Sequence, residues 1–151
     1  MSLRETLLDH QKESLKSRDS LRLSVLRLLL SQVKNREIEK GKGEILTDEE
    51  IIETISSMVR KMDESIQGFT AGGRTDLADK ERAEQAILRA YLPEPLSEEA
   101  VDQLISEGIA ATGASGPKGL GALMQWLSPR TKGRVDNKIV SQKVKAALEN
   151  S

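Results

Sequence analysis

Cysteine is absent from this chain of 151 residues, and histidine occurs only once, as His10. Without cysteine, disulfide bonds, thiol nucleophiles and zinc sites with thiolate ligands are excluded. A single histidine cannot form a cluster of metal ligands, and its polar neighbours indicate a surface residue. We therefore expect no metal site and no cofactor.

Aromatic residues are almost as scarce, because the chain has only Phe69, Tyr91 and Trp126. Modules that recognise RNA by stacking bases on aromatic platforms need more aromatic side chains than this. The hydrophobic core must consequently be built from aliphatic side chains.

Long apolar segments are also missing. The cluster Leu28–Leu30 is far shorter than a membrane span, and the first five residues carry charges where a signal peptide needs an apolar run. We expect a cytoplasmic protein that does not interact with membranes.

What the sequence has in abundance is helical periodicity. Thr47 and Glu50 have the spacing of a capping box, and apolar residues then recur at three- and four-residue steps up to Ile66. We expect this helix to end near Gly68, with Phe69 folding back to anchor a turn at Gly72-Gly73. No stretch alternates with the two-residue period of a strand, so the sequence predicts an all-α protein.

Pro93 and Pro95 divide the chain, because each lacks a backbone donor and disfavours helix in the residue before it. We expect two domains: a bundle of long helices over residues 1–92 and a compact three-helix domain over residues 93–151. In the second domain, helices are predicted to begin at Ser97, Pro117 and Asp136. Ser128-Pro129 is predicted to end the middle one.

Catalytic residues are not apparent. The carboxylates occupy first helical turns and polar faces, where capping and solvation explain them, and no base is placed to activate a serine or threonine. We predict no catalytic residue.

Charge is distributed unevenly, although the net charge is only −1. Between Gly116 and Leu148 the only acidic residue is Asp136, whereas seven residues are basic. Phosphate neutralisation is one use of such a cluster, and an ordinary solvated surface is the alternative. The predicted RNA-binding residues are Lys118, Arg130, Lys132, Arg134, Lys138 and Lys145.

Several short motifs resemble the GatB/YqeY family, and in particular its free-standing YqeY-like branch. They extend over nearly the whole chain, and the part from Phe69 to Pro93 is the most specific. The motifs are Leu26-Arg27-Leu28-Leu29 with Lys34-Asn35, Glu64-Ser65-Ile66, Phe69 with Gly72-Gly73-Arg74, Asp76-Leu77-Ala78, Tyr91-Leu92-Pro93, Gly133-Arg134 with Asp136, and Val140-Ser141 with Val144-Lys145.

The resemblance implies a role in translation. The related domain forms the tail of the B subunit of the glutamyl/aspartyl-tRNA amidotransferase, where it helps to hold the tRNA. The family is therefore linked to carbon–nitrogen ligase activity with glutamine as amido donor. This chain is too short to include an amidotransferase catalytic domain, and we expect no catalysis by the chain alone.

Two functions of different classes remain open. The first is an accessory protein that binds tRNA or a tRNA-bearing complex. The second is an adaptor that binds a protein partner and has no RNA role.

Overall fold

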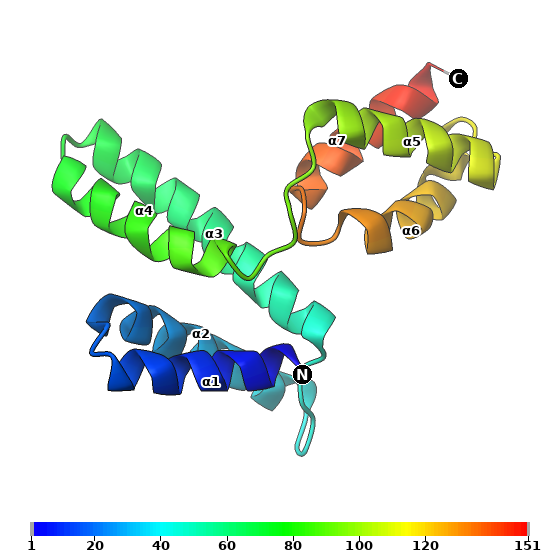
Figure 1. The fold of residues 1–151 in the computed structure, drawn as a ribbon. Coiled ribbons are helices and arrows are strands. Elements are labelled where there is room, and N and C mark those ends of the chain that lie inside the picture. The colour runs from blue at the N-terminus through cyan, green and yellow to red at the C-terminus, as the bar shows by residue number, and fades with distance from the viewer. Residues whose placement is uncertain (1, 151) are drawn as a thin grey trace. The chain divides into compact units, whose positions relative to one another are not determined.

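The computed structural model describes residues 2–150, and Figure 1 shows them as helices joined by loops. Within that range there is no strand, so the predicted all-α class is confirmed. The elements are α1 (Leu3–Lys16), α2 (Ser20–Lys40), α3 (Asp48–Ala71), α4 (Thr75–Arg89), α5 (Glu98–Thr112), the 3₁₀ turn η1 (Pro117–Gly119), α6 (Leu120–Thr131) and α7 (Asn137–Glu149).

The capping box at the start of α3 forms as its spacing predicted. The backbone N–H of Glu50 donates to the Thr47 hydroxyl at 3.2 Å, and the N–H of Thr47 donates to the Glu50 carboxylate at 3.1 Å. Lys40 donates to the same carboxylate, and this hydrogen bond with that of Thr47 lowers the pKa of Glu50 to about 2. A carboxylate with a lowered pKa contributes stability above its ordinary pKa and loses it as the pH falls towards the lowered value. The cap therefore persists well below pH 4.5.

Helix α3 is longer than expected. It continues through Gly68 to Ala71, and Phe69 is a helical residue, so our expectation that Phe69 folds back is wrong. A glycine inside a helix costs only about 1 kcal/mol, which packing can offset. The chain turns instead at Gly73, whose φ of 74° suits glycine, while the N–H of Arg74 donates to the Phe69 carbonyl at 2.8 Å.

Helix α6 also passes the residue predicted to stop it. Pro129 lies in its last turn, and the helix ends at Thr131. Proline removes a single backbone hydrogen bond. Because Pro129 lies close to the end of α6, this loss does not stop the helix before Thr131. The N–H of Lys132 then donates to the Ser128 carbonyl at 3.1 Å and closes the helix.

The chain divides into two compact units, Met1–Leu92 and Pro93–Ser151. In the first unit, α3 and α4 pack along each other over an aliphatic core. The buried Gln85 side chain joins these two helices, because its amide donates to the Val59 carbonyl at 3.1 Å and to the Asp63 carboxylate at 2.7 Å. The fully buried large side chains of this core are Leu7, Leu26, Leu29, Val33, Ile51, Ile55 and Leu88.

The second unit contains α5, η1, α6 and α7 around its own aliphatic core. Gly108 allows α5 to approach α6 closely: a Cβ at this position would lie 2.6 Å from Leu123 Cδ1 and 2.8 Å from Trp126 Cε3. The buried aliphatic side chains of this core are Val101, Ile105, Ala114, Leu123, Leu127, Val140, Val144 and Leu148.

We predict that each unit folds on its own. A fragment of residues 93–151 should be helical by circular dichroism and should melt cooperatively, with low stability because its core is small. A fragment that gives only a random-coil spectrum would show that the units depend on each other.

Replacing Gly108 with Ala should destabilise the protein by about 1–3 kcal/mol, because the added methyl group overpacks the contact between α5 and α6. Gly121 is the matched control, since it is also helical but a Cβ there meets nothing within 4 Å. Gly121→Ala should be neutral or stabilise by up to about 1 kcal/mol through helix propensity. Urea unfolding of both variants measures the difference, and equal effects would rule out the packing argument.

Candidate nucleic-acid interface

The predicted RNA-binding residues lie in two places in the second unit. Arg130 lies in the last turn of α6, Lys132 and Arg134 lie in the loop that follows, and Lys138 lies in the first turn of α7. The other two residues are elsewhere: Lys118 in η1, and Lys145 two turns further along α7.

Arg134 binds to the segment that precedes α5. Its backbone carbonyl accepts a hydrogen bond from the N–H of Leu96 at 2.9 Å, and its side-chain Nε donates to the Glu94 carbonyl at 2.9 Å. Gly133, with a φ of 74°, makes the preceding turn, and the Asp136 carboxylate caps α7 by accepting from the N–H of Lys138. The Gly133-Arg134 motif with Asp136 therefore builds a loop.

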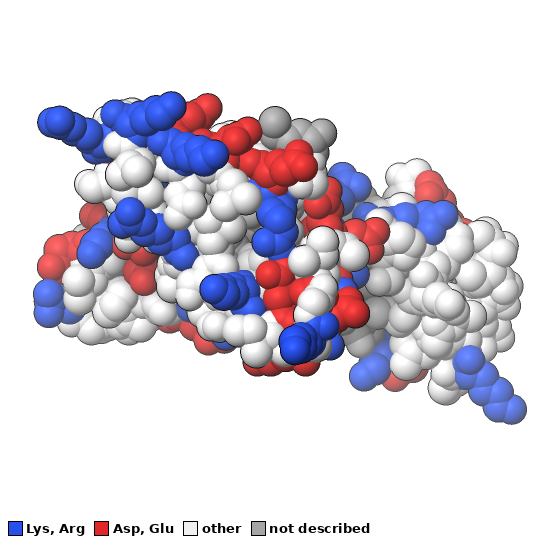
Figure 2. Space-filling view, turned by 90° about the horizontal axis from the view of Figure 1, so that it is seen from below, with Lys and Arg blue, Asp and Glu red and all other residues white. Residues whose placement is uncertain are grey.

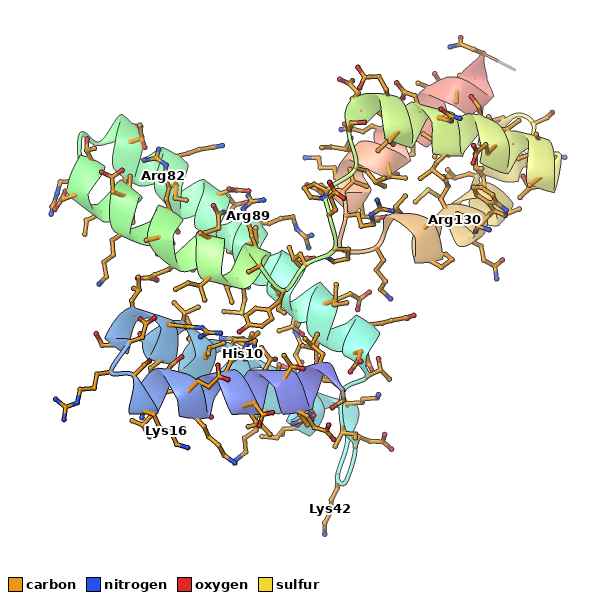
Figure 3. The ribbon with its side chains drawn as sticks, viewed as in Figure 1. His10, Lys16, Lys42, Arg82, Arg89 and Arg130 are labelled. Atoms are coloured by element: carbon orange, nitrogen blue, oxygen red, sulfur yellow. The ribbon has the colours of Figure 1, made fainter. Side chains whose placement is uncertain are left out.

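Arg130 and Lys132 also interact within the protein. The Arg130 guanidinium lies over the Trp126 ring, 3.7 Å from its centroid, and donates a hydrogen bond to the Trp126 carbonyl. Figure 3 labels Arg130 on α6. Lys132 is half-buried and has an interaction of its own. The position of the Arg130 guanidinium is therefore already set by the fold.

The three remaining lysines, Lys118, Lys138 and Lys145, are exposed, and within residues 2–150 no ion pair joins any of them to an acidic residue. We call this set the lysine face. Lys138 and Lys145 are two helical turns apart, so they share one side of α7, about 10 Å from each other along the axis.

A neighbouring side of α7 carries the buried Val140, Val144 and Leu148. Lys145 also lines a pocket of about 230 Å³ with Pro117, Leu120, Leu148 and Glu149. The turn that carries Lys118 therefore lies beside Lys145, and η1 extends the lysine face.

Lys143, on another side of α7, has a structural role. Its ammonium group donates to the Asp102 carboxylate at 2.8 Å and to the Glu98 carboxylate at 3.1 Å, and these hydrogen bonds raise its pKa. A lysine with a raised pKa contributes stability that is complete below its ordinary pKa of 10.5 and is lost as the pH rises through the higher value. At neutral pH this ion-pair group joins α5 to α7.

The arrangement can neutralise phosphates but offers little for reading bases. Ammonium groups on helical stems contact phosphate oxygens without sequence preference. On the face shown in Figure 2, Lys and Arg side chains are scattered among acidic and uncharged ones. Attraction of a polyanion must therefore depend on local groups such as the lysine face.

Other kinds of site find no support in the described part of the chain. Among residues 2–150, no group of three or more histidine, aspartate or glutamate side chains is arranged to hold a metal ion. No helix there is long and apolar enough to cross a membrane.

His10 is the side chain that sequence reasoning misjudged most clearly. We interpreted it as a surface residue, but it is half-buried, and its Nδ1 lies 2.6 Å from the Tyr91 hydroxyl oxygen. Its position four residues after Thr6 and four before the fully buried Ser14 was the available signal. Small polar residues follow the inner side of α1.

Taken together, the described residues form a small all-α protein of two units. The chain belongs to the YqeY-like family: the family model described as "Yqey-like protein" matches residues 4–148. The resemblance seen in the short motifs is thereby confirmed for the YqeY family.

Several curated relatives are fungal proteins named "Altered inheritance of mitochondria protein 41, mitochondrial". The protein of Candida glabrata is 32% identical over 89 residues, which are 59% of this chain and 49% of the relative. The protein of Lachancea thermotolerans is 31% identical over 108 residues, 70% of this chain and 57% of the relative. The protein of Pyrenophora tritici-repentis is 26% identical over 140 residues, which are 91% of this chain and 76% of the relative. The chain thus spans about half the length of the first two relatives.

These names contradict our expectation of a cytoplasmic protein, because they point to mitochondria. The expectation used the lack of an apolar signal segment. Mitochondrial targeting segments are amphipathic and rich in arginine and serine, so that lack could not exclude them.

Replacing Arg134 with Ala should destabilise the protein by about 1–2 kcal/mol, since the Glu94 carbonyl loses its charged hydrogen-bond donor. Lys138→Ala is the control, because it removes an equal charge that has no acidic partner. It should change the free energy of unfolding by less than about 0.5 kcal/mol. Denaturant unfolding compares the two variants, and an Arg134→Ala protein as stable as the parent would contradict the structural role of Arg134.

Proposed function

We propose that the protein is an accessory factor of translation that binds folded RNA, and tRNA in particular, through its second unit. The observation that carries the proposal is the lysine face, three exposed ammonium groups on α7 and η1 that form no ion pair with an acidic residue within residues 2–150. Arg130, held over the Trp126 ring, adds a fixed positive charge. Residues 93–151 would act as one three-helix domain that presents these charges.

Phosphate contacts suit this surface better than base contacts. The side chains of the lysine face are single ammonium donors, which attract phosphate as point charges. Trp126 is half-buried and covered by Arg130, so it is not offered as a stacking platform. Recognition would then depend on the shape of the folded RNA and the spacing of its phosphates.

The resemblance of the chain to the tail of the amidotransferase B subunit favours tRNA over other RNAs. In that role the chain would hold or present tRNA, and any amide transfer would be carried out by another protein. The absence of a predicted nucleophile–base pair in the sequence agrees with this division of labour.

Replacing Lys118, Lys138 and Lys145 together with Ser should weaken binding to bulk tRNA by about tenfold or more at low salt. The slope of log affinity against log salt should fall by about 2–3, because fewer counterions are released. These lysines lack acidic partners, so the helical circular dichroism spectrum should not change. Filter binding or fluorescence anisotropy over a salt series measures both quantities.

The matched control replaces Lys42, Lys61 and Lys80, three exposed lysines of the first unit, with Ser. Figure 3 labels Lys42 in the loop between α2 and α3. This variant has the same net charge as the first, so it should bind tRNA almost as tightly as the parent. Equal losses in the two triple variants would mean that only bulk charge matters and would contradict the proposed interface.

A separate observation favours the adaptor alternative. The outer side of α2 exposes Leu28 and Ile38, at 49% and 68%, together with Arg27 and Lys34. Exposed aliphatic residues beside basic ones suit a protein surface with acidic groups. A partner that is retained by tagged protein after ribonuclease treatment would support this alternative.

A further inference from the structure

A pocket in the first unit lies outside every surface considered for RNA. It has a volume of about 520 Å³ and is lined by residues of α1, α2, and α4 with the turn that follows it: Thr6, His10, Arg22, Ile87, Ala90 and Tyr91. In Figure 3, His10 lies on the side of α1 that faces α4. The volume of the pocket is within the range typical of sites for small molecules.

One wall of the pocket holds a fixed polar pair. Nδ1 of His10 and the hydroxyl of Tyr91 share a hydrogen bond of 2.6 Å, and the two ring centroids are 5.5 Å apart. When the tyrosine hydroxyl donates to Nδ1, the neutral imidazole carries its proton on Nε2. No hydrogen bond is found for Nε2 among the described residues, so it can donate to a ligand.

Arg22 brings a cation to the same pocket. Its guanidinium lies 3.9 Å from the Glu13 carboxylate, too far for a hydrogen bond, and the Glu13 side chain is 66% exposed. The Arg22 side chain itself is 32% exposed. Its planar donors are therefore held at the protein surface with only a weak competing anion, and their geometry matches a carboxylate or a phosphate.

The remaining wall is apolar. Ile87 and the methyl group of Ala90 come from the end of α4 and the turn after it. A ligand that interacts with both walls needs an anionic group to bind Arg22 and His10. It also needs a small apolar group to contact Ile87 and Ala90.

We propose that this pocket binds a small organic anion, a carboxylate or phosphate monoester joined to an apolar group. The site is separate from the lysine face, so the proposal does not depend on RNA binding. A free anion such as inorganic phosphate would satisfy only the polar wall. An uncharged analogue would satisfy only the apolar wall.

The chain offers an unusually direct test, because His10 is its single histidine and Tyr91 its single tyrosine. The ring resonances of both residues can be followed by NMR at constant pH while benzoate, phenyl phosphate, benzyl alcohol or inorganic phosphate is added. Benzoate and phenyl phosphate should shift both sets of resonances along saturating curves in the millimolar range. Benzyl alcohol and inorganic phosphate should bind about tenfold more weakly or not at all.

Three variants of the full chain assign the binding to the pocket. Arg22→Gln should weaken benzoate binding by about tenfold or more. Arg27→Gln, which removes an exposed arginine of the same helix, should leave it unchanged. Glu13→Gln should tighten binding by about two- to fivefold, because the competing carboxylate is removed.

The proposal is overturned if neither aromatic anion gives a saturable shift of the His10 and Tyr91 resonances. It is equally overturned if Arg22→Gln binds benzoate as tightly as the parent. Should Arg22→Gln fail to fold, the Glu13→Gln variant decides, and unchanged or weaker binding by that variant contradicts the proposed role of Arg22.

Discussion

In the second unit, Arg134 joins the segment before α5 to the loop before α7. One hydrogen bond joins its carbonyl to Leu96, and another joins its side chain to the Glu94 carbonyl. These two hydrogen bonds hold the segment before α5 against the loop before α7. At the end of that loop, Asp136 caps α7. The lysines of α7 lie on a helix whose start is fixed in this way, so Arg134 has a positioning role in the loop before α7.

A second constraint comes from the small number of aromatic residues. Aliphatic side chains fill both cores, and helices must approach closely to exclude water without large rings. Gly108 meets this need between α5 and α6, and the buried amide of Gln85 joins α3 to α4. Two of the three aromatic side chains interact with a named partner: Trp126 lies under the Arg130 guanidinium, and Tyr91 binds His10.

Local features of the fold could be predicted from the sequence, whereas contacts between distant residues could not. The Thr47–Glu50 box and the caps at Ser97 and Asp136 depend on neighbouring residues, and they formed as expected. The ends of α3 and α6 were misplaced because one glycine costs a helix only about 1 kcal/mol and a proline in the last turn removes a single hydrogen bond. The basic cluster was visible as charge, but no local pattern shows that Arg134 binds a carbonyl 40 residues away or that His10 binds Tyr91.

The most direct test of the RNA proposal is to map the backbone amide resonances of the full chain while bulk tRNA is added at low salt. The proposal predicts that perturbed amides concentrate around Lys118, Lys138 and Lys145, and that the perturbations disappear as salt is raised. Perturbations centred on the outer side of α2, or none at all when tRNA is in excess, would contradict an RNA interface on α7 and η1.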